Sequence, residues 1–382
     1  MTTNAAPTAK PGGPLSGLRV VEFVGIGPGP HCAMLLSDLG AEVVRIDREG
    51  GNGWANPVVD RGRASLTIDV RSPAGVAQCL DVIAHADVVI EGFRPGTMER
   101  LGLGPDVMLA RNPRLVFGRV TGWGQTGPLA KAAGHDINYI AITGALAAMG
   151  KPGEPATPPL NLVGDFGGGS MLLAFGIMTA LWERERSGQG QVVDAAMVDG
   201  VSSLMSMFAG LLPSGRIDMA REANLLGGAA PFYRCYLCAD GQEIAIGPLE
   251  PQFYADLLKR IDAPAELFDR QNEAALWPER SVALAEIFRT KTVAEWCALL
   301  EGTDACFAPV VALQDAPDHP HMAERGVYVE HDGLKQVAPV PRFSRTPGGI
   351  QETGDGAAMV ERWSAGSRLP DKVCGFEGSA ST

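Results

Sequence analysis

Cysteine and histidine are scarce in this chain, and their spacing matches neither a disulfide framework nor a metal site. The 382 residues include seven cysteines, an odd number that does not suit a set of disulfides. Cys235 and Cys238 form a lone CxxC pair, with no second pair at zinc spacing. Because aromatic and apolar residues flank the pair, we expect thiols buried in a strand, no metal, and a cytoplasmic, reducing location.

Long apolar runs are missing as well. The longest, 171–182, is too short to cross a bilayer and predicts a buried helix. The N-terminal stretch lacks the apolar core of a secretory signal, so we expect a disordered leader over 1–13.

A net charge of −12 argues against nucleic acid and membrane surfaces as partners, although a local arginine cluster can still bind an anionic ligand.

The apolar pattern predicts two domains of different texture. In the first part of the chain, short apolar runs bounded by glycine alternate with helical stretches, which indicates a parallel sheet wrapped by helices. We predict strands at 18–24, 41–47, 66–69, 86–91 and 115–121, and helices at 31–39, 74–84 and 170–186. This gives a Rossmann-like large domain over 14–210.

A smaller α+β domain follows a linker at 211–224. Within 225–325 we predict a hairpin of 232–239 with 243–247, turned at Asp240-Gly241, and helices at 251–261 and 293–301. The proline-rich segment that follows predicts a return of the chain, so that 326–382 packs on the large domain.

The segment 25–30, with the sequence GIGPGP, imitates a dinucleotide-binding loop between a strand and a helix. The match fails in detail, because Pro30 stands where a glycine would let helix and strand pack closely. Prolines also lack the N–H donors that cradle a pyrophosphate. We therefore expect a tight strand-to-helix turn and no nicotinamide site.

His135 and Asp165 are the most informative residues of the chain. His135 follows Gly134 just before a helical run, where neighbouring N–H groups can face a ligand. Asp165 precedes three glycines, whose lack of side chains would let a ligand approach closely, although Asp165 or Ser170 could equally cap the next helix. An imidazole and a carboxylate facing each other across one carbon can invert a stereocentre next to a carbonyl without cofactor chemistry.

Arginines near the expected strand ends favour a bound polyanion, because open α/β sheets bind ligands there. The candidates are Arg48, Arg61, Arg63, Arg71, Arg94 and Arg100.

Several stretches together resemble the α-methylacyl-CoA racemase family, within the family III CoA-transferase superfamily. The likeness runs along nearly the whole chain and is strongest in 122–128 (GWGQTGP), 134–139 (GHDINY), 161–170 (NLVGDFGGGS), 193–200 (VDAAMVDG) and 250–254 (EPQFY). It implies a Rossmann-like large domain with a smaller α+β domain, in an interlocked homodimer.

The resemblance also assigns site residues. His135 and Asp165 fall on the family's acid–base pair, Glu250 on an accompanying glutamate and Asp136 on the aspartate beside the histidine. Glu250 would come from the partner chain of the dimer. Coenzyme A contacts are implied at or near Arg48, Ile68, Asp69, Val70, Arg71, Gly92, Phe93, Arg94, Arg100, Gly134 and Tyr139.

The implied reaction interconverts (R)- and (S)-2-methylacyl-CoA thioesters through an enolate, with coenzyme A as part of the substrate and no separate cofactor. His135 would take the proton from the (S) face and protonated Asp165 would deliver one to the other. Asp136 and Glu250 would orient the imidazole, and N–H groups near Asp136 would stabilise the enolate.

Two other functions stay open. The related CoA transferases carry an aspartate at the position of Asp165, use it as a nucleophile that forms an acyl anhydride, and lack the histidine. A third alternative is a protein that binds acyl-CoA without catalysis, which the presence of His135, Asp165 and Glu250 disfavours.

Overall fold

The structure, a computed structural model, describes residues 12–51, 53–264 and 269–366. The chain divides into two compact units. Unit 1 comprises Met1–Ile140, Asn161–Ser203 and Val329–Thr382, and unit 2 comprises Ala141–Leu160 and Leu204–Tyr328. Segment Ala141–Leu160 thus clusters with unit 2, whereas the predicted large domain ran without a break to 210. Most of the predicted leader, 1–11, lies outside the described residues.

Unit 1 is built on a six-stranded sheet of order β3-β2-β1-β4-β5-β6, in which all neighbours are parallel. This confirms the predicted Rossmann-like parallel sheet. The central strands are buried along their whole length, which explains why they appear in the sequence as unbroken apolar runs. The strands are β1 (Arg19–Phe23), β2 (Glu42–Asp47), β3 (Arg63–Thr67), β4 (Val88–Glu91), β5 (Val116–Thr121) and β6 (Val192–Ala196).

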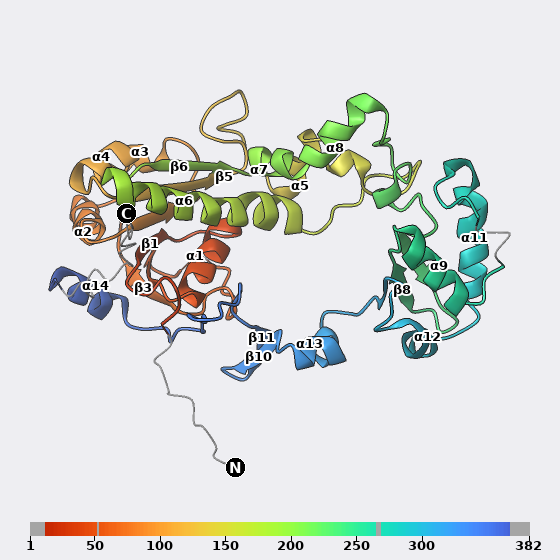
Figure 1. Cartoon of the computed structure of the whole chain (residues 1–382). Coiled ribbons are helices and arrows are strands. Elements are labelled where there is room, and N and C mark those ends of the chain that lie inside the picture. The colour runs from red at the N-terminus through yellow and green to blue at the C-terminus, as the bar shows by residue number, and fades with distance from the viewer. Residues whose placement is uncertain (1–11, 52, 265–268, 367–382) are drawn as a thin grey trace, which may run out of the picture. The chain divides into compact units, whose positions relative to one another are not determined.

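Helices cover both faces of this sheet (Figure 1). Helices α1 (Pro28–Asp38) and α6 (Leu172–Ser187) share one hydrophobic core with the sheet. On the other face, α2 (Pro73–Ile83), α4 (Pro105–Arg111) and α14 (Gly356–Ser364) bury a second core. Helix α3 (Thr97–Arg100) is a short helix of this unit, and α5 (Asp136–Ile142) and α7 (Met197–Leu204) begin in it.

Two predicted boundaries are wrong for different physical reasons. Helix α1 begins at Pro28 rather than at 31, because proline lacks only an N–H that a first helical turn leaves unbonded. Strand β3 begins at Arg63 rather than at 66, because the side chain of Arg63 is fully buried and paired with Glu22. A hydrophobic pattern cannot reveal a strand that begins with a buried ion pair.

The glycine-rich segment before α6 is helical. Leu162–Met171 (η2) is a π-helical stretch that continues directly into α6, so the predicted helix start at 170 is wrong. A Cβ on Gly200 of α7 would lie 1.9 Å from the carbonyl oxygen of Gly168. A Cβ on Gly169 would lie 3.1 Å from the Cβ of Pro28. These glycines serve close packing of η2 on α7 and α1, which offsets their low helix propensity.

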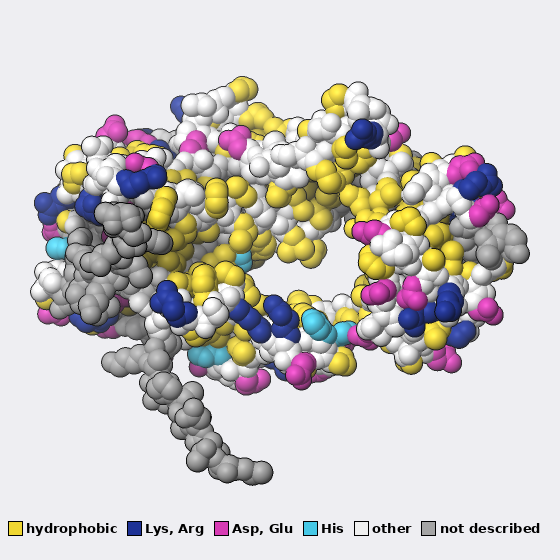
Figure 2. Space-filling view, in the orientation of Figure 1, with side chains coloured by type: hydrophobic (Ala, Val, Ile, Leu, Met, Phe, Trp, Pro, Cys, Tyr) yellow, Lys and Arg dark blue, Asp and Glu magenta, His cyan; other side chains and the backbone are white. Residues whose placement is uncertain are grey.

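An exposed apolar row lies along η2 and α6. Met171, Phe175, Met178 and Trp182 are all exposed, and hydrophobic side chains gather over this helix in Figure 2. With η2 included, Leu162–Ser187 is long and apolar enough to span a membrane by length and composition, a test that core helices of soluble proteins also pass. Large contiguous apolar patches on protein surfaces occur at interaction sites.

Unit 2 is smaller and contains an antiparallel sheet of order β7-β8-β9. The predicted hairpin is confirmed as β7 (Arg234–Leu237) and β8 (Glu243–Ile246), and β9 (Phe307–Pro309) completes the sheet. Helices α9 (Pro251–Arg260), α11 (Trp277–Phe288) and α12 (Val293–Leu300) bury a core against it. Both cysteines of the CxxC pair are free. Cys238 is buried as predicted, but Cys235 is exposed, because it alternates with the inward-facing Tyr236.

The other helices and strands of the described chain are short. They are η1 (Leu146–Ala148), α8 (Ser206–Leu211), η3 (Leu212–Ser214), η4 (Leu225–Gly227), η5 (Ala274–Leu276), η6 (Ala316–Asp318), α13 (Pro320–Glu324), β10 (Tyr328–His331) and β11 (Leu334–Val337).

Candidate active site

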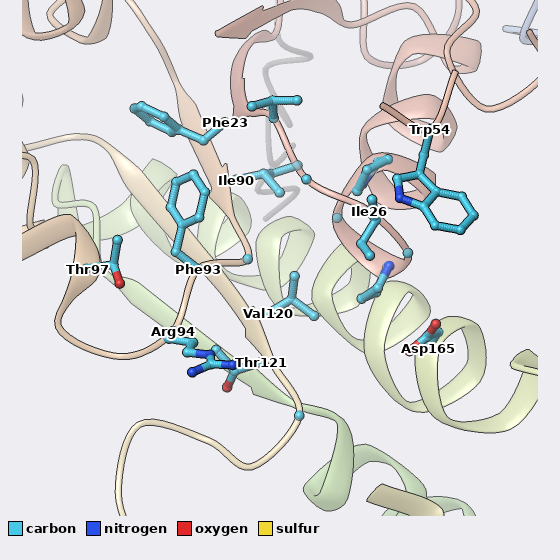
Figure 3. Close-up of a pocket in the computed structure, with 18 of the residues that line it drawn as sticks. Phe23, Ile26, Trp54, Ile90, Phe93, Arg94, Thr97, Val120, Thr121 and Asp165 are labelled. Carbon is cyan, nitrogen blue, oxygen red and sulfur yellow. The ribbon is translucent and has the colours of Figure 1, made fainter. Parts of the chain in front are cut away.

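A cavity of about 1790 Å³ opens at the carboxyl edge of the parallel sheet, within unit 1 (Figure 3). Its walls are the segments that follow the strands, above all those after β1 and β4. The strand order reverses between these two neighbours, since β1 leads on to β2 in one direction and β4 to β5 in the other. Open α/β sheets bind their ligands at such a point.

The glycine turn after β1 forms one wall of the cavity. Gly27 has a φ of 72° and precedes the first turn of α1, which confirms the predicted strand-to-helix turn. A Cβ on Gly27 would lie 3.3 Å from Oδ2 of Asp165. The backbone of the turn therefore lies directly against the carboxyl group of Asp165.

His135 lies on the cavity wall immediately before α5, with its side chain exposed. Asn138 fixes the backbone there. Its side-chain Oδ1 accepts a hydrogen bond from the backbone N–H of His135 at 3.0 Å, and its backbone N–H donates to the carbonyl oxygen of His135 at 2.8 Å. The Tyr139 hydroxyl donates to the carbonyl oxygen of Gly134, and the Tyr139 ring lies so close to Gly122 that a Cβ there would be 2.0 Å away. The imidazole thus projects from a backbone held at both neighbours.

Asp165 lines the same cavity and is half-buried in η2. Its Oδ2 accepts a hydrogen bond from Nδ2 of Asn161 at 3.1 Å. Burial raises the pKa of the Asp165 carboxyl. The Asn161 donor opposes this shift, the Asp136 carboxylate adds to it, and His135 acts on the Asp165 pKa in the lowering direction. The structure therefore brings His135 and Asp165 to one cavity, and Asp165 retains its proton to higher pH than a free aspartate.

Asp136 joins the two elements that carry this pair. It is 6 % exposed, and its Oδ2 accepts the backbone N–H of Asp165 at 2.7 Å. Gly164 leaves just enough room for that carboxylate, since a Cβ on Gly164 would lie 2.4 Å from Oδ2. The predicted role of Asp136 was to orient the imidazole, whereas the bond that the structure contains positions Asp165.

The arginine candidates separate into two groups. Arg48, Arg71 and Arg94 follow β2, β3 and β4, are exposed, and line the cavity. The prediction was wrong for the other pair, because Arg61 and Arg63 are buried and ion-paired with Asp38 and with Glu22.

Arg100 is outside the cavity lining and donates to Oγ1 of Thr97 at 3.0 Å. The other residues that the resemblance assigned to coenzyme A all line the cavity: Ile68, Asp69, Val70, Gly92, Phe93, Gly134 and Tyr139.

Glu250 belongs to unit 2, where it is exposed and precedes the first turn of α9. In the residues that the structure describes, no group of three or more His, Cys, Asp and Glu side chains could hold a metal ion.

Sequence reasoning missed residues that act through neighbouring elements. Asn161 precedes Asp165 by four residues, one turn of a helix, and this spacing would have been a signal had η2 been predicted as helical. His31 of α1 also went unassigned. Its Nδ1 lies 2.7 Å from Oγ of Ser170 and its ring lies 4.8 Å from that of Phe166, so it holds α1 against η2. Burial lowers the pKa of His31.

Comparison with known proteins agrees with this geometry. The family model described as CoA-transferase family III matches residues 15–354. The chain belongs to CoA-transferase family III. It is 46 % identical over 334 residues to the α-methylacyl-CoA racemase of Mus musculus, covering 87 % of each chain, and 42 % identical to that of Homo sapiens, covering 87 % of this chain and 90 % of the human protein.

Among solved structures of this family, a CAIB/BAIF family protein from Brucella suis is 26 % identical with a TM-score of 0.78, over 92 % of this chain and all of that one. The fold predicted from the sequence, a family III CoA-transferase fold with a parallel sheet, is confirmed.

Proposed function

We propose that this protein is an isomerase that interconverts the (R) and (S) forms of 2-methylacyl-CoA thioesters. The observation that carries the proposal is the joint placement of His135 and Asp165 on one cavity at the sheet's switch point. Similarity to two α-methylacyl-CoA racemases along 87 % of the chain supports the same chemistry.

In the proposed reaction, one of the two groups removes the proton from the carbon next to the thioester carbonyl. The electron pair moves into the carbonyl to give an enolate, and the other group protonates the same carbon from the opposite face. The reverse reaction exchanges the roles, so no oxidant, reductant or second substrate is needed. Acid–base catalysis of this kind contributes roughly 10²–10⁴-fold. The raised pKa of Asp165 supports its role as the proton donor.

The remaining roles follow from placement. The N–H groups that begin α5 lie next to His135, and we assign them to the enolate oxygen. Arg48, Arg71 and Arg94 follow three strands at the carboxyl edge, and we assign them to the phosphates of coenzyme A. A homodimer, with Glu250 contributed by the partner, and a cytoplasmic location remain predictions. The exposed apolar row along η2 and α6 supports the dimer, because contact with a second chain would remove these side chains from water.

The experiment is deuterium exchange at the α-carbon of a 2-methylacyl-CoA in heavy water, followed by mass spectrometry. The wild-type protein should exchange this proton with no acceptor acid present. His135→Ala and Asp165→Ala should each slow exchange by at least ~10²-fold. His85→Ala, a histidine of unit 1 outside the cavity lining, is the matched control and should exchange at the wild-type rate.

CoA transfer to an added carboxylic acid, with Asp165 as nucleophile, is the alternative. If the protein moves coenzyme A to the acid and leaves the α-proton in place, the isomerase proposal is wrong. If it binds acyl-CoA and catalyses neither reaction, the non-catalytic alternative holds.

A further inference from the structure

A buried ion-pair network lies behind the cavity wall, outside the lining itself. Arg119 of β5 pairs in register with Glu91 at the end of β4, and these residues are 5 % and 1 % exposed. The Arg119 Nε donates to Oε1 of Glu91 at 2.7 Å. Its Nη1 and Nη2 donate to the two carboxylate oxygens of Glu99 in α3, at 2.8 and 3.3 Å. The guanidinium therefore joins two strands and a helix.

This network holds both ends of one loop. The second oxygen of Glu91 accepts the backbone N–H of Phe93 at 2.7 Å, which fixes the loop where it leaves β4. Glu99 fixes α3, where the loop ends. Between the two anchors, the residues from Gly92 to Pro95, together with Thr97, line the cavity. Figure 3 shows Phe93, Arg94 and Thr97 along one wall, with Asp165 across the view from them.

The charges in this network are costly to bury. Burial raises the pKa of Glu91, and Arg119 opposes the shift, while the same arginine lowers the pKa of the more exposed Glu99. Replacing a buried ion pair with well-packed apolar side chains often leaves stability unchanged or raises it. The burial of Arg119 and Glu91 is therefore weak evidence that the pair serves to stabilise the fold. A fully bonded polar network does fix geometry, because each charge has only one arrangement that satisfies it.

We propose that Arg119 is a positioning residue that sets the Gly92–Gly96 loop and thereby aims Arg94 at the phosphate-bearing end of the thioester substrate. The inference rests on the proposed function in one respect, that the cavity binds coenzyme A. Arg119 acts through its two glutamates and does not touch the ligand.

The experiment compares Arg119→Lys with Arg184→Lys. Arg184 is a matched control, because it is 7 % exposed and bonds to Asp87, just before β4 at the opposite edge of the same sheet. Lysine keeps the charge and loses the fork that bonds both glutamates at once. The α-proton exchange is measured with a 2-methylacyl-CoA and with the matching pantetheine thioester, which lacks phosphates, and the Kd for free coenzyme A is measured by calorimetry.

For Arg119→Lys we expect the KM for the CoA thioester and the Kd for coenzyme A to rise about tenfold, which corresponds to about 1.4 kcal/mol. The kcat and the KM for the pantetheine thioester should stay within about threefold of wild type, since the reacting groups lie on other elements. Arg184→Lys should leave all these values near wild type. Glu99→Gln, a milder change at a half-exposed partner, should shift the same constants in the same direction.

An equal rise in KM for both thioesters, or unchanged coenzyme A binding in Arg119→Lys, would overturn the inference. The proposed function fails separately. If the wild-type protein exchanges no proton but binds coenzyme A, and Arg119→Lys weakens that binding while Arg184→Lys does not, the positioning role holds and the isomerase proposal falls.

Discussion

Substituting alanine for Gly164 tests the link between the two proposed acid–base elements. The added Cβ would lie 2.4 Å from Oδ2 of Asp136, an oxygen that accepts the Asp165 N–H at 2.7 Å. The new methyl group and the carboxylate cannot occupy these positions together. The carboxylate must leave the amide, or η2 must move away from α5.

The size of the effect follows from the interactions lost. Losing a buried hydrogen bond to a charged acceptor costs about 1.5–3 kcal/mol. Overpacking adds about 1–3 kcal/mol, and alanine returns about 0.5–1 kcal/mol over glycine in a helix. We expect urea denaturation to show that Gly164→Ala reduces the free energy of unfolding by about 2–5 kcal/mol. The substitution should also slow α-proton exchange at least tenfold, because the side chain of Asp165 moves with its backbone.

A double-mutant cycle separates this clash from a general intolerance of alanine. In an Asp136→Ala background the obstructing carboxylate is absent, so adding Gly164→Ala should cost less than about 1 kcal/mol. Gly210→Ala is the matched control, since Gly210 lies in helix α8 with no atom within 4 Å of the added Cβ, and it should be neutral or slightly stabilising. The reasoning is refuted if Gly164→Ala costs the same in both backgrounds, or no more than Gly210→Ala.

Three further predictions concern single side chains. Because burial raises the pKa of Asp165, the folded state binds more protons there than the unfolded state, and this group's contribution to stability falls as pH rises above the unfolded pKa. Asp165→Asn should therefore raise the Tm more at pH 7 than at pH 4, and an equal shift at both would contradict this. His31→Phe keeps the ring near Phe166 and loses the bond to Ser170, so urea unfolding should show a loss of about 1 kcal/mol; no loss would mean that this bond does not stabilise the protein. Glu22→Gln should cost about 1–3 kcal/mol by the same measurement, since Arg63 loses the buried one of its two carboxylate partners and keeps the more exposed Asp60, and no measurable loss would show that Asp60 compensates fully.

The centre of the sheet could be predicted because β1, β4 and β5 are buried along their whole length. Such strands form continuous apolar runs, and glycines mark their ends, so alternation with helices was enough to give a parallel sheet. The π-helical η2 could not be predicted in this way. Its glycines disfavour a helix locally, and only contacts with α7 and α1, which are remote in sequence or separated by strands, make the helix the stable form.

The candidate site likewise contains residues that the sequence could identify and contacts that it could not. His135 and Asp165 could be chosen by residue type and glycine-rich surroundings. Arg61 and Arg63 were wrongly chosen by the same logic, because a sequence does not show which carboxylates the fold brings to an arginine. The bond from the Asp165 amide to Asp136 joins residues 29 positions apart, and a pattern of residue types has no means of expressing it.

The same carboxyl group can transfer a proton or attack a thioester, and its surroundings decide which is favoured. Nucleophilic attack needs the carboxylate, whereas proton delivery needs the acid. Desolvation is the largest influence on the pKa of Asp165 and favours the acid, while Asn161 favours the carboxylate. A thioester that fills the cavity displaces water from beside Asp165 and strengthens desolvation further. In the proposed isomerase reaction, substrate binding would move Asp165 toward the protonated form, and His135 on the same cavity would supply the base that a proton donor requires.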